Sequence, residues 1–251
     1  MTVHFIGAGP GAADLLTLRA VRLLESSPVC LYAGTYIGEE VLAHCAAGAT
    51  LVDTAQLDLD TIISHCVAAS KLGHDVARLC SGDPSLYSAI AEQTRRLDVA
   101  GVGWDVTPGV PAYAAAAAII GRELTVPEVA QTVVLTRAQR DSTKMPNTEA
   151  LSHFAKSRAT LALHLAIRQT REIAASLVAD YGHDCPVVVV ANAEQPSQVV
   201  LRGTLVDIAG QVEAAGLRQA AIILVGRALG RDEADAVESH LYGSRLRPDA
   251  R

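Results

Sequence analysis

TVHFIGAGPGAADLL, residues 2–16, decides the fold, because it joins an apolar strand to a glycine-rich loop and then to a helix. Val3 to Ile6 form the predicted strand, and Gly7 to Gly11 form the loop. Apolar residues at helical spacing, from Leu15 to Leu24, predict that a helix starts directly after the loop. Glycines at such a junction allow positive φ, and the unpaired N–H groups at a helix start attract anions. The stretch therefore predicts a binding site built into an α/β fold.

The glycine spacing also matches the dinucleotide-binding fingerprint, G-x-G-x-x-G/A, through Gly7, Gly9 and Ala12. Two features weigh against a nicotinamide oxidoreductase. That fold places an Asp or Glu at the end of its second strand, whereas the second apolar run here, VCLY (29–32), is followed by AGTYIG. Pro10 also lacks a backbone N–H that would donate to a pyrophosphate. From the glycines alone, a dinucleotide site and a site for another ligand both stay open.

The composition describes a compact globular protein, since half of the 251 residues are hydrophobic. The formal net charge is −6, and a nucleic-acid binder normally carries clustered Lys and Arg, so we expect no nucleic-acid partner. The longest apolar run, Ala112 to Ile120, is about half of what a membrane span needs, so we expect no membrane partner. The five cysteines form no C-x-x-C pair, which indicates buried thiols in a reducing compartment. Because the first strand begins at once, we expect no signal peptide and a cytoplasmic protein.

Strands alternate with helices through the N-terminal half, which predicts a mostly parallel sheet with helices on its faces. Ligands gather at the carboxyl ends of the strands in such sheets, and a second glycine loop, SGDP (81–84), follows the strand at 75–79. The C-terminal half adds a hairpin between 186–191 and 199–202, which predicts a mixed sheet. We expect two α/β domains, residues 1–118 and 119–251.

Six segments in order carry a resemblance to a known family: FIGAGPGAADLLTLRA, LCSGDPSLYS, TPGVPAYAAAAA, TLALHLA, PVVVVANAEQPSQ and AIILVG. Together they resemble the tetrapyrrole methylases, the class III S-adenosylmethionine-dependent methyltransferases. The resemblance implies an active-site cleft between the two domains, a homodimer, a tetrapyrrole substrate and S-adenosyl-L-methionine folded in the cleft. S-adenosyl-L-homocysteine is then the product.

A finer resemblance rests on GRELTVPEVAQTVVLTRAQ (121–139) and LYAGTYI (31–37). Both segments are similar to the members that methylate C-11 of precorrin-4, or of its cobalt form. Ala33 stands where the uroporphyrinogen methylases usually have an Asp, which removes their proposed proton acceptor. The sequence does not decide whether the natural substrate contains cobalt. The other open alternatives are a methylase for another precorrin carbon, for RNA or for protein, and a tetrapyrrole carrier that needs no S-adenosylmethionine.

The resemblance also implies which residues contact the cofactor. Two of them depart from the residue types often found in the family, because Pro111 replaces a Ser or Thr and Ala193 replaces a Gly. No catalytic side chain and no metal is predicted, because the sulfonium methyl group is already activated. The implied cofactor contacts are Pro10, Ser81, Gly82, Asp83, Leu86, Pro111, Ala112, Leu165, Ala193 and Ala221.

The carboxylates of a tetrapyrrole need cations or N–H donors. We hypothesise that backbone N–H groups from Gly9 to Ala12 supply some of these donors and that basic side chains supply the rest. Tyrosines beside the loops are further candidates for lining the cleft. The predicted substrate-binding residues are Gly9, Gly11, Tyr36, Tyr113, Arg122, Arg137 and Arg140, with Lys144 as an additional cation.

Three residue groups have a structural interpretation beside the functional one. Asp83 is either catalytic or a loop aspartate of an Asp-Pro turn that holds backbone N–H groups near the cofactor, and we favour the second. His44-Cys45 and His65-Cys66 fit no standard zinc spacing and are better explained by helix packing. His164 lies in an apolar strand, which favours a hydrogen-bonded core histidine.

Overall fold

The computed structural model describes residues 1–139 and 144–230, and the chain divides into two compact units. Unit 1 comprises Met1–Ala115 together with Asn192–Ser197, and unit 2 comprises Ala116–Ala191 and the residues from Gln198 onward. The division falls within helix α5 (Ala112–Ile120). The predicted domain boundary, between residues 118 and 119, lies in the same helix.

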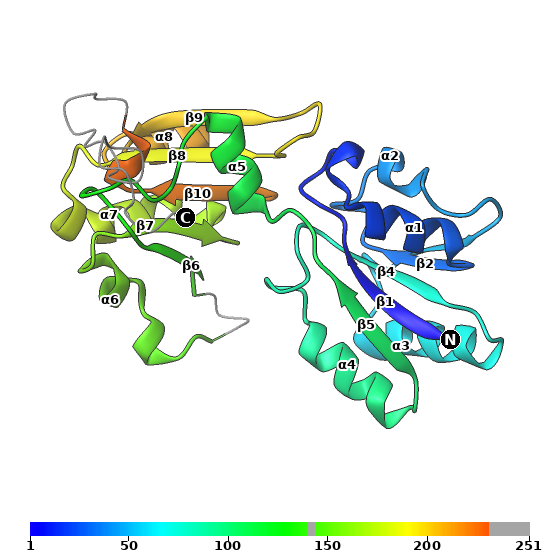
Figure 1. The fold of residues 1–251 in the computed structure, drawn as a ribbon. Coiled ribbons are helices and arrows are strands. Elements are labelled where there is room, and N and C mark those ends of the chain that lie inside the picture. The colour runs from blue at the N-terminus through cyan, green and yellow to red at the C-terminus, as the bar shows by residue number, and fades with distance from the viewer. Residues whose placement is uncertain (140–143, 231–251) are drawn as a thin grey trace, which may run out of the picture. The chain divides into compact units, whose positions relative to one another are not determined.

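Unit 1 contains a five-stranded parallel sheet with the strand order β3-β2-β4-β1-β5 (Figure 1). The central strand β4 lies beside β1, which pairs with β5 on its other side. The carboxyl ends of these neighbours are level, because Gly7 pairs with Cys80 and Ile6 pairs with Thr107. The strands are β1 (Thr2–Gly7), β2 (Val29–Tyr32), β3 (Thr50–Asp53), β4 (Val76–Cys80) and β5 (Gly103–Thr107).

Helices cover both faces of this sheet. Successive side chains of a strand point to opposite faces, so β1 contributes side chains to the core on each side. Val3 and Phe5 of β1 face a core that includes Ile62 of α3 and Leu97 of α4. Ile6 faces the other core, with residues of α1 and α2. The helices are α1 (Leu18–Ser26), α2 (Glu39–Leu42), α3 (Leu59–Lys71) and α4 (Ile90–Val99). The predicted parallel sheet with helices on both faces is confirmed.

The first helix starts later than the sequence predicts. Ala13–Leu15 form a single 3₁₀ turn, and α1 begins at Leu18. Thr17 is the N-cap, and its hydroxyl oxygen accepts a hydrogen bond of 3.1 Å from the N–H of Ala20. This cap satisfies one of the N–H groups that a helix start leaves unpaired. The sequence predicts an earlier start because the apolar spacing already begins at Leu15. The prediction that a helix start follows the glycine loop directly is therefore wrong.

Unit 2 contains a mixed sheet with the strand order β6-β7-β10-β8-β9. Strands β6 and β7 are parallel, and the remaining pairs are antiparallel, including the predicted β8–β9 hairpin. The predicted mixed sheet is thus confirmed. The strands are β6 (Val133–Arg137), β7 (Thr160–His164), β8 (Pro186–Ala191), β9 (Val199–Thr204) and β10 (Ala221–Val225). The helices besides α5 are α6 (Leu151–Ala155), α7 (Thr170–Tyr181) and α8 (Ile208–Ala214), with 3₁₀ turns at Asn147–Glu149, Ile167–Gln169 and Arg227–Leu229.

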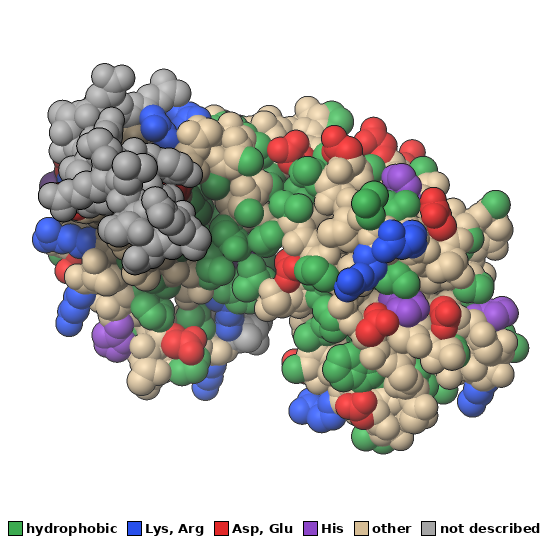
Figure 2. Space-filling view, viewed as in Figure 1, with side chains coloured by type: hydrophobic (Ala, Val, Ile, Leu, Met, Phe, Trp, Pro, Cys, Tyr) green, Lys and Arg blue, Asp and Glu red, His purple; other side chains and the backbone are tan. Residues whose placement is uncertain are grey.

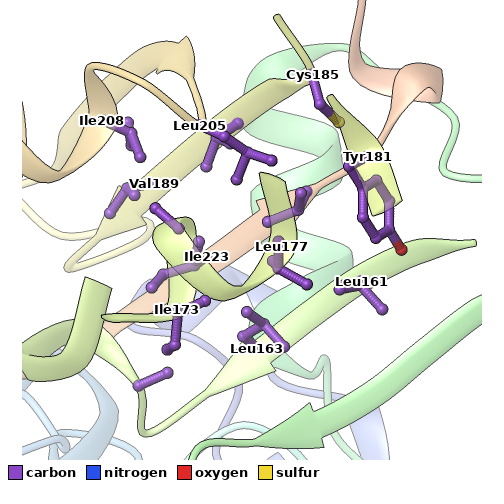
Figure 3. Packing of buried hydrophobic residues seen from close by; sticks show 14 of the residues in the cluster. Leu161, Leu163, Ile173, Leu177, Tyr181, Cys185, Val189, Leu205, Ile208 and Ile223 are labelled. Atoms are coloured by element: carbon purple, nitrogen blue, oxygen red, sulfur yellow. The ribbon is translucent and has the colours of Figure 1, made fainter. Parts of the chain in front are cut away.

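Helix α7 packs its apolar side on the centre of this sheet (Figure 3). Ile173 and Leu177 lie over Leu163 and Ile223, which are all buried. Tyr181 ends the helix, and its buried hydroxyl donates a hydrogen bond of 2.5 Å to the Ala159 carbonyl oxygen. These strand and helix side chains therefore form one core for unit 2.

Within residues 1–139 and 144–230, no helix is long and apolar enough to cross a membrane. On the face that Figure 2 shows, Lys and Arg side chains of the described residues lie in small groups among acidic, apolar and uncharged ones.

Candidate functional site

Three loops of unit 1 follow the carboxyl ends of three neighbouring strands. The loop after β1 contains Gly9 and Gly11, the loop after β4 starts at Ser81, and the loop after β5 contains Gly109. Because β1 lies between β4 and β5 in the parallel sheet, these loops lie side by side. In such sheets this edge is where ligands bind.

Glycine is required where these loops meet, because their backbones touch. A Cβ atom on Gly7 would lie 2.4 Å from the nitrogen of Gly109, and one on Gly109 would lie 2.3 Å from the carbonyl oxygen of Gly82. Gly9 and Gly82 exchange backbone hydrogen bonds of 3.1 and 2.8 Å, and both have positive φ. The fingerprint glycines Gly7 and Gly9 thus serve packing between loops.

The N–H of Gly9 is already paired, because it donates a hydrogen bond of 3.1 Å to the Gly82 carbonyl oxygen. The predicted contact between Gly9 and the substrate stays a prediction. Glycine at this position has a different physical reason, which is its left-handed φ of 72°.

Asp83 fastens two of the loops together. One carboxylate oxygen accepts hydrogen bonds from the N–H of Ser85, at 2.8 Å, and from the Ser85 hydroxyl. The other accepts a hydrogen bond of 2.8 Å from the N–H of Gly109. Burial raises the pKa of Asp83, but the three hydrogen bonds outweigh it and hold the pKa below its usual value. A carboxylate with its lone pairs used in this way is a structural clamp, which is the role favoured from the sequence.

The loop Asn192–Ser197 belongs to unit 1 and adjoins Gly11. A Cβ atom on Gly11 would lie 2.6 Å from Cγ of Gln195 and 2.7 Å from the carbonyl oxygen of Ala193. Two residues of the loop, Asn192 and Glu194, adopt left-handed backbone conformations. The structure therefore brings the predicted cofactor contact Ala193 beside the predicted substrate contact Gly11. The sequence does not mark Gln195 as a site residue, and only its contact with Gly11 in the folded structure identifies it.

The remaining predicted residues of unit 1 lie in these loops, at the start of α5 or in the loop after β2. Pro111 and Ala112 at the start of α5 adjoin Gly82, whose added Cβ would be 3.6 Å from Cα of Pro111. Ser81 and Tyr36 are exposed. Three further candidates are half-buried, namely Pro10, Leu86 and Tyr113.

Asp53 is a second aspartate that the sequence did not point out. Its carboxylate, at the end of β3, accepts hydrogen bonds from the N–H groups of Gly34, at 3.0 Å, and Ala55, at 2.9 Å. These two bonds lower the pKa of Asp53. The sequence signal that could have identified Asp53 is an acidic residue at the end of β3, the strand next to β2. Asp53 fixes the backbone at Gly34, in the loop that contains Tyr36.

In unit 2, predicted residues gather at the end of the sheet where β7 stops. Leu165 directly follows β7, is 48% exposed and has a left-handed φ of 53°. Arg137, at the end of β6, pairs with His164 and is half-buried, and its guanidinium donates a hydrogen bond of 3.5 Å to the Lys144 carbonyl oxygen. Ala221 starts β10 opposite Ala191. Arg122 is half-buried after α5, and Arg140 lies outside the described residues.

A hollow of about 300 Å³ in unit 2 does not coincide with these residues. Its lining includes Glu128, Gln131, Ser157 and Arg158, which precede β6 and β7. It therefore adjoins the amino ends of these two parallel strands, whereas ligands of open α/β sheets bind at the carboxyl ends. We assign it no role in the site.

The described residues 1–139 and 144–230 contain no group of three or more His, Cys, Asp or Glu side chains placed to hold a metal ion. The five cysteines are free thiols. Burial lowers the pKa of His164 to about 4, so its imidazole is neutral at pH 7.

Comparison with known proteins decides the family. The family model of tetrapyrrole (corrin/porphyrin) methylases matches residues 2–209. The chain belongs to the tetrapyrrole methylase family. Its relatives include precorrin-4 C(11)-methyltransferase of Rhodococcus erythropolis, 54% identical over 97% of both proteins, and the Sinorhizobium sp protein of the same name, 51% identical over 96% of this chain and 95% of the relative. Cobalt-precorrin-4 C(11)-methyltransferase of Priestia megaterium is 37% identical over 91% of this chain and 89% of the relative.

Solved structures of tetrapyrrole methylases have the same fold. A cobalt-precorrin-4 methyltransferase of cobalamin biosynthesis superimposes with a TM-score of 0.88 at 36% identity, covering 91% of this chain and 96% of that chain. Uroporphyrin-III C-methyltransferase from Thermus thermophilus, solved with S-adenosyl homocysteine, gives a TM-score of 0.77 at 26% identity, covering 91% of this chain and 93% of that chain. Membership of this family of methylases makes the chain a methyltransferase that uses S-adenosylmethionine.

Proposed function

We propose that this tetrapyrrole methylase transfers the methyl group of S-adenosyl-L-methionine to C-11 of precorrin-4, a step of cobalamin biosynthesis. The observation that carries the proposal is the identity of 48–54% to relatives named for precorrin-4, over nearly their whole length. Relatives named for the cobalt form are 37% identical. That difference favours the cobalt-free substrate over cobalt-precorrin-4.

The residues present suit S-adenosylmethionine. Gly7, Gly82 and Gly109 pack so closely that no side chain intrudes where the three loops meet, which leaves backbone and small residues to meet a nucleoside. The Asp83 carboxylate is engaged inside the loops, so it does not present a free charge to the ligand. We infer that the cofactor contacts include Ser81, Leu86, Ala112, Leu165 and Ala221.

The reaction requires the protein mainly to position the cofactor and the substrate. When bound, the cofactor supplies a methyl group already activated by its sulfonium. The nucleophilic ring carbon forms a bond to that methyl carbon, the carbon–sulfur bond breaks, and its electron pair stays on sulfur. The protein has to hold the two carbons about 3–3.5 Å apart and keep water out. Rigid loops such as the Asp83–Gly109 clamp serve this purpose, because a displaced methyl group reacts far more slowly.

The cations meet the carboxylates of the macrocycle in this proposal. Arg137 is the best-placed candidate, since it ends β6 beside the strand that leads into Leu165. Arg122 and Lys144 are further candidates, and Gly11 and the tyrosines Tyr36 and Tyr113 are expected to contact the ring. We also expect a homodimer, to be checked by sedimentation, and a cytoplasmic location, where the five free thiols stay reduced.

Two measurements test the proposal. Calorimetric titrations with S-adenosylhomocysteine and with NADH should show micromolar binding of the first and none of the second. Incubation with S-adenosylmethionine and either precorrin-4 or cobalt-precorrin-4 should add one methyl group by mass, faster with precorrin-4. Binding of NADH alone would support the dinucleotide interpretation of Gly7, Gly9 and Ala12. Faster methylation of the cobalt form would assign the chain to the alternative substrate.

A further inference from the structure

The loop after β4 is fixed at a second point, beyond Asp83. Gln93 lies in the first turn of α4 and is 4% exposed. Its side-chain N–H₂ group donates hydrogen bonds to the carbonyl oxygens of Ser88, at 3.1 Å, and Ala89, at 3.3 Å. Its side-chain oxygen accepts a hydrogen bond of 3.2 Å from Nε of Arg78. One amide thus connects the end of the loop to the central strand.

Arg78 is itself held in place. Its Nη1 donates a hydrogen bond of 3.1 Å to the Thr54 hydroxyl, and that hydroxyl donates one of 3.0 Å to the carbonyl oxygen of Tyr32. Thr54 is 5% exposed, and burial lowers the pKa of Arg78. Among the described residues, Arg78 makes no ion pair, so neutral acceptors such as Gln93 and Thr54 hold its charge. Rearranging Gln93 would leave a buried guanidinium without one of these acceptors.

The segment that Gln93 holds has an unfavourable backbone. Tyr87 and Ala89 have φ values of 54° and 51°, which residues with a Cβ atom rarely adopt. The two carbonyl groups bound by Gln93 belong to Ser88 and Ala89, at the end of this segment. Hydrogen bonds to these carbonyls stabilise a conformation that the chain would otherwise leave.

We propose that Gln93, held by Arg78, is a positioning residue that sets the conformation of residues 83–89 and thereby the affinity for S-adenosylmethionine. The inference rests on the proposed function, since it takes this loop as part of the cofactor site. The residue type fits, because only an amide both accepts from Arg78 and donates to two carbonyl groups. A Glu retains the acceptor and loses the donors, whereas a Leu loses both.

The experiment compares Gln93→Glu and Gln93→Leu with the wild type in the full-length protein. The readouts are the Kd for S-adenosylhomocysteine, the thermal midpoint, and KM and kcat with precorrin-4. Gln93→Glu should lower the thermal midpoint less than Gln93→Leu, because it keeps an acceptor for Arg78 while it loses both donors, and it should weaken S-adenosylhomocysteine binding about tenfold. KM for S-adenosylmethionine should rise by a similar factor, with a smaller change in kcat. Gln93→Leu should lower both the midpoint and the affinity.

Two controls separate loop positioning from general instability. Gln56→Leu makes the same change at an exposed glutamine of unit 1, and Ile62→Val lowers stability through the core behind α3. Neither should change the affinity for S-adenosylhomocysteine. Wild-type affinity in Gln93→Glu would overturn this inference and leave the proposed function intact. Failure of the wild-type protein to bind S-adenosylhomocysteine would instead overturn the proposed function, and this inference with it.

Discussion

The carboxylate of Asp83 lies 2.8 Å from the backbone nitrogen of Gly109, and this hydrogen bond joins the loop after β4 to the loop after β5. Strand β1 lies between those two strands, so the bond joins the loops that follow the two neighbours of β1. Gly7, the last residue of β1, packs against Gly109 at the same place. Three loops that are far apart in the sequence are thereby fixed as one surface.

Asp83→Asn should destabilise the protein in a pH-dependent manner. An amide offers one acceptor oxygen in place of two, so at pH 7 we expect a loss of about 1–3 kcal/mol in the free energy of unfolding. Because the folded pKa of Asp83 lies below its usual 3.8, the carboxylate stabilises the wild type above about pH 4 and loses this effect as the pH falls through the lowered value. Urea denaturation at pH 7 and pH 3 tests this. An equal gap between the two proteins at both pH values would contradict it.

Gly109→Ala should cost at least about 2 kcal/mol, because the new methyl group would overlap backbone atoms of Gly82 and Gly7, which cannot rotate away. Gly103→Ala, at the start of the strand that leads into this loop, is the control, since its Cβ would have its nearest neighbour at 3.6 Å. The control should be neutral or slightly stabilising. Urea midpoints of the two variants give the comparison, and equal midpoints would show that the loops adjust easily.

His164 should make stability fall on mild acidification. Its folded pKa of about 4 lies below the ordinary 6.5. Between these two pH values the imidazole binds a proton in the unfolded chain and stays neutral in the folded protein. The resulting loss develops as the pH falls from about 6.5 towards 4 and then levels off. His164→Gln should flatten the stability curve in this window, whereas the exposed His183→Gln should not. An unchanged slope in His164→Gln would show that folding does not shift the pKa of His164.

Cys45 should be the thiol that alkylates first. A hydrogen bond with Cys30 lowers the pKa of Cys45, and the side chain is only half-buried. The same contact and burial raise the pKa of Cys30, and burial raises that of the other three cysteines. Brief iodoacetamide treatment at pH 8 followed by peptide mass analysis should find one modified site. Cys45→Ser should abolish this early modification, and labelling at Cys66 first would refute the assignment.

Arg137→Ala should weaken tetrapyrrole binding about tenfold, as expected for one lost charge-assisted hydrogen bond. S-adenosylhomocysteine binding should be unchanged. Arg171→Ala is the control, because Arg171 is an exposed arginine of the same unit that is paired with Glu213. Fluorescence titration with a tetrapyrrole carboxylate gives the tetrapyrrole affinity of each variant. Equal affinity in Arg137→Ala and wild type would remove Arg137 from the substrate site.

The glycine loops could be predicted because an apolar strand pattern is followed by glycines, which mark places where another backbone or a ligand comes close. Their partners could not, since the pairing of Gly9 with Gly82 depends on which strands are neighbours. The start of α1 was misplaced because apolar spacing continued through Leu15 and Leu16, while the helix geometry begins at Leu18 after the Thr17 cap. The cleft between the domains and the individual ligand contacts stay predictions.

The sequence alone determined the alternation of strands and helices, the two kinds of sheet and the family, because periodicity and motif order are properties of the linear chain. The tertiary structure decided what Gly7, Asp83 and Gln93 do. It showed that Gly7 packs against Gly109 and that Gln93 connects Arg78 to the end of a loop. It also placed the loop Asn192–Ser197 beside Gly11. Such roles depend on atoms within hydrogen-bond or contact distance, and these distances are set only when distant segments fold together.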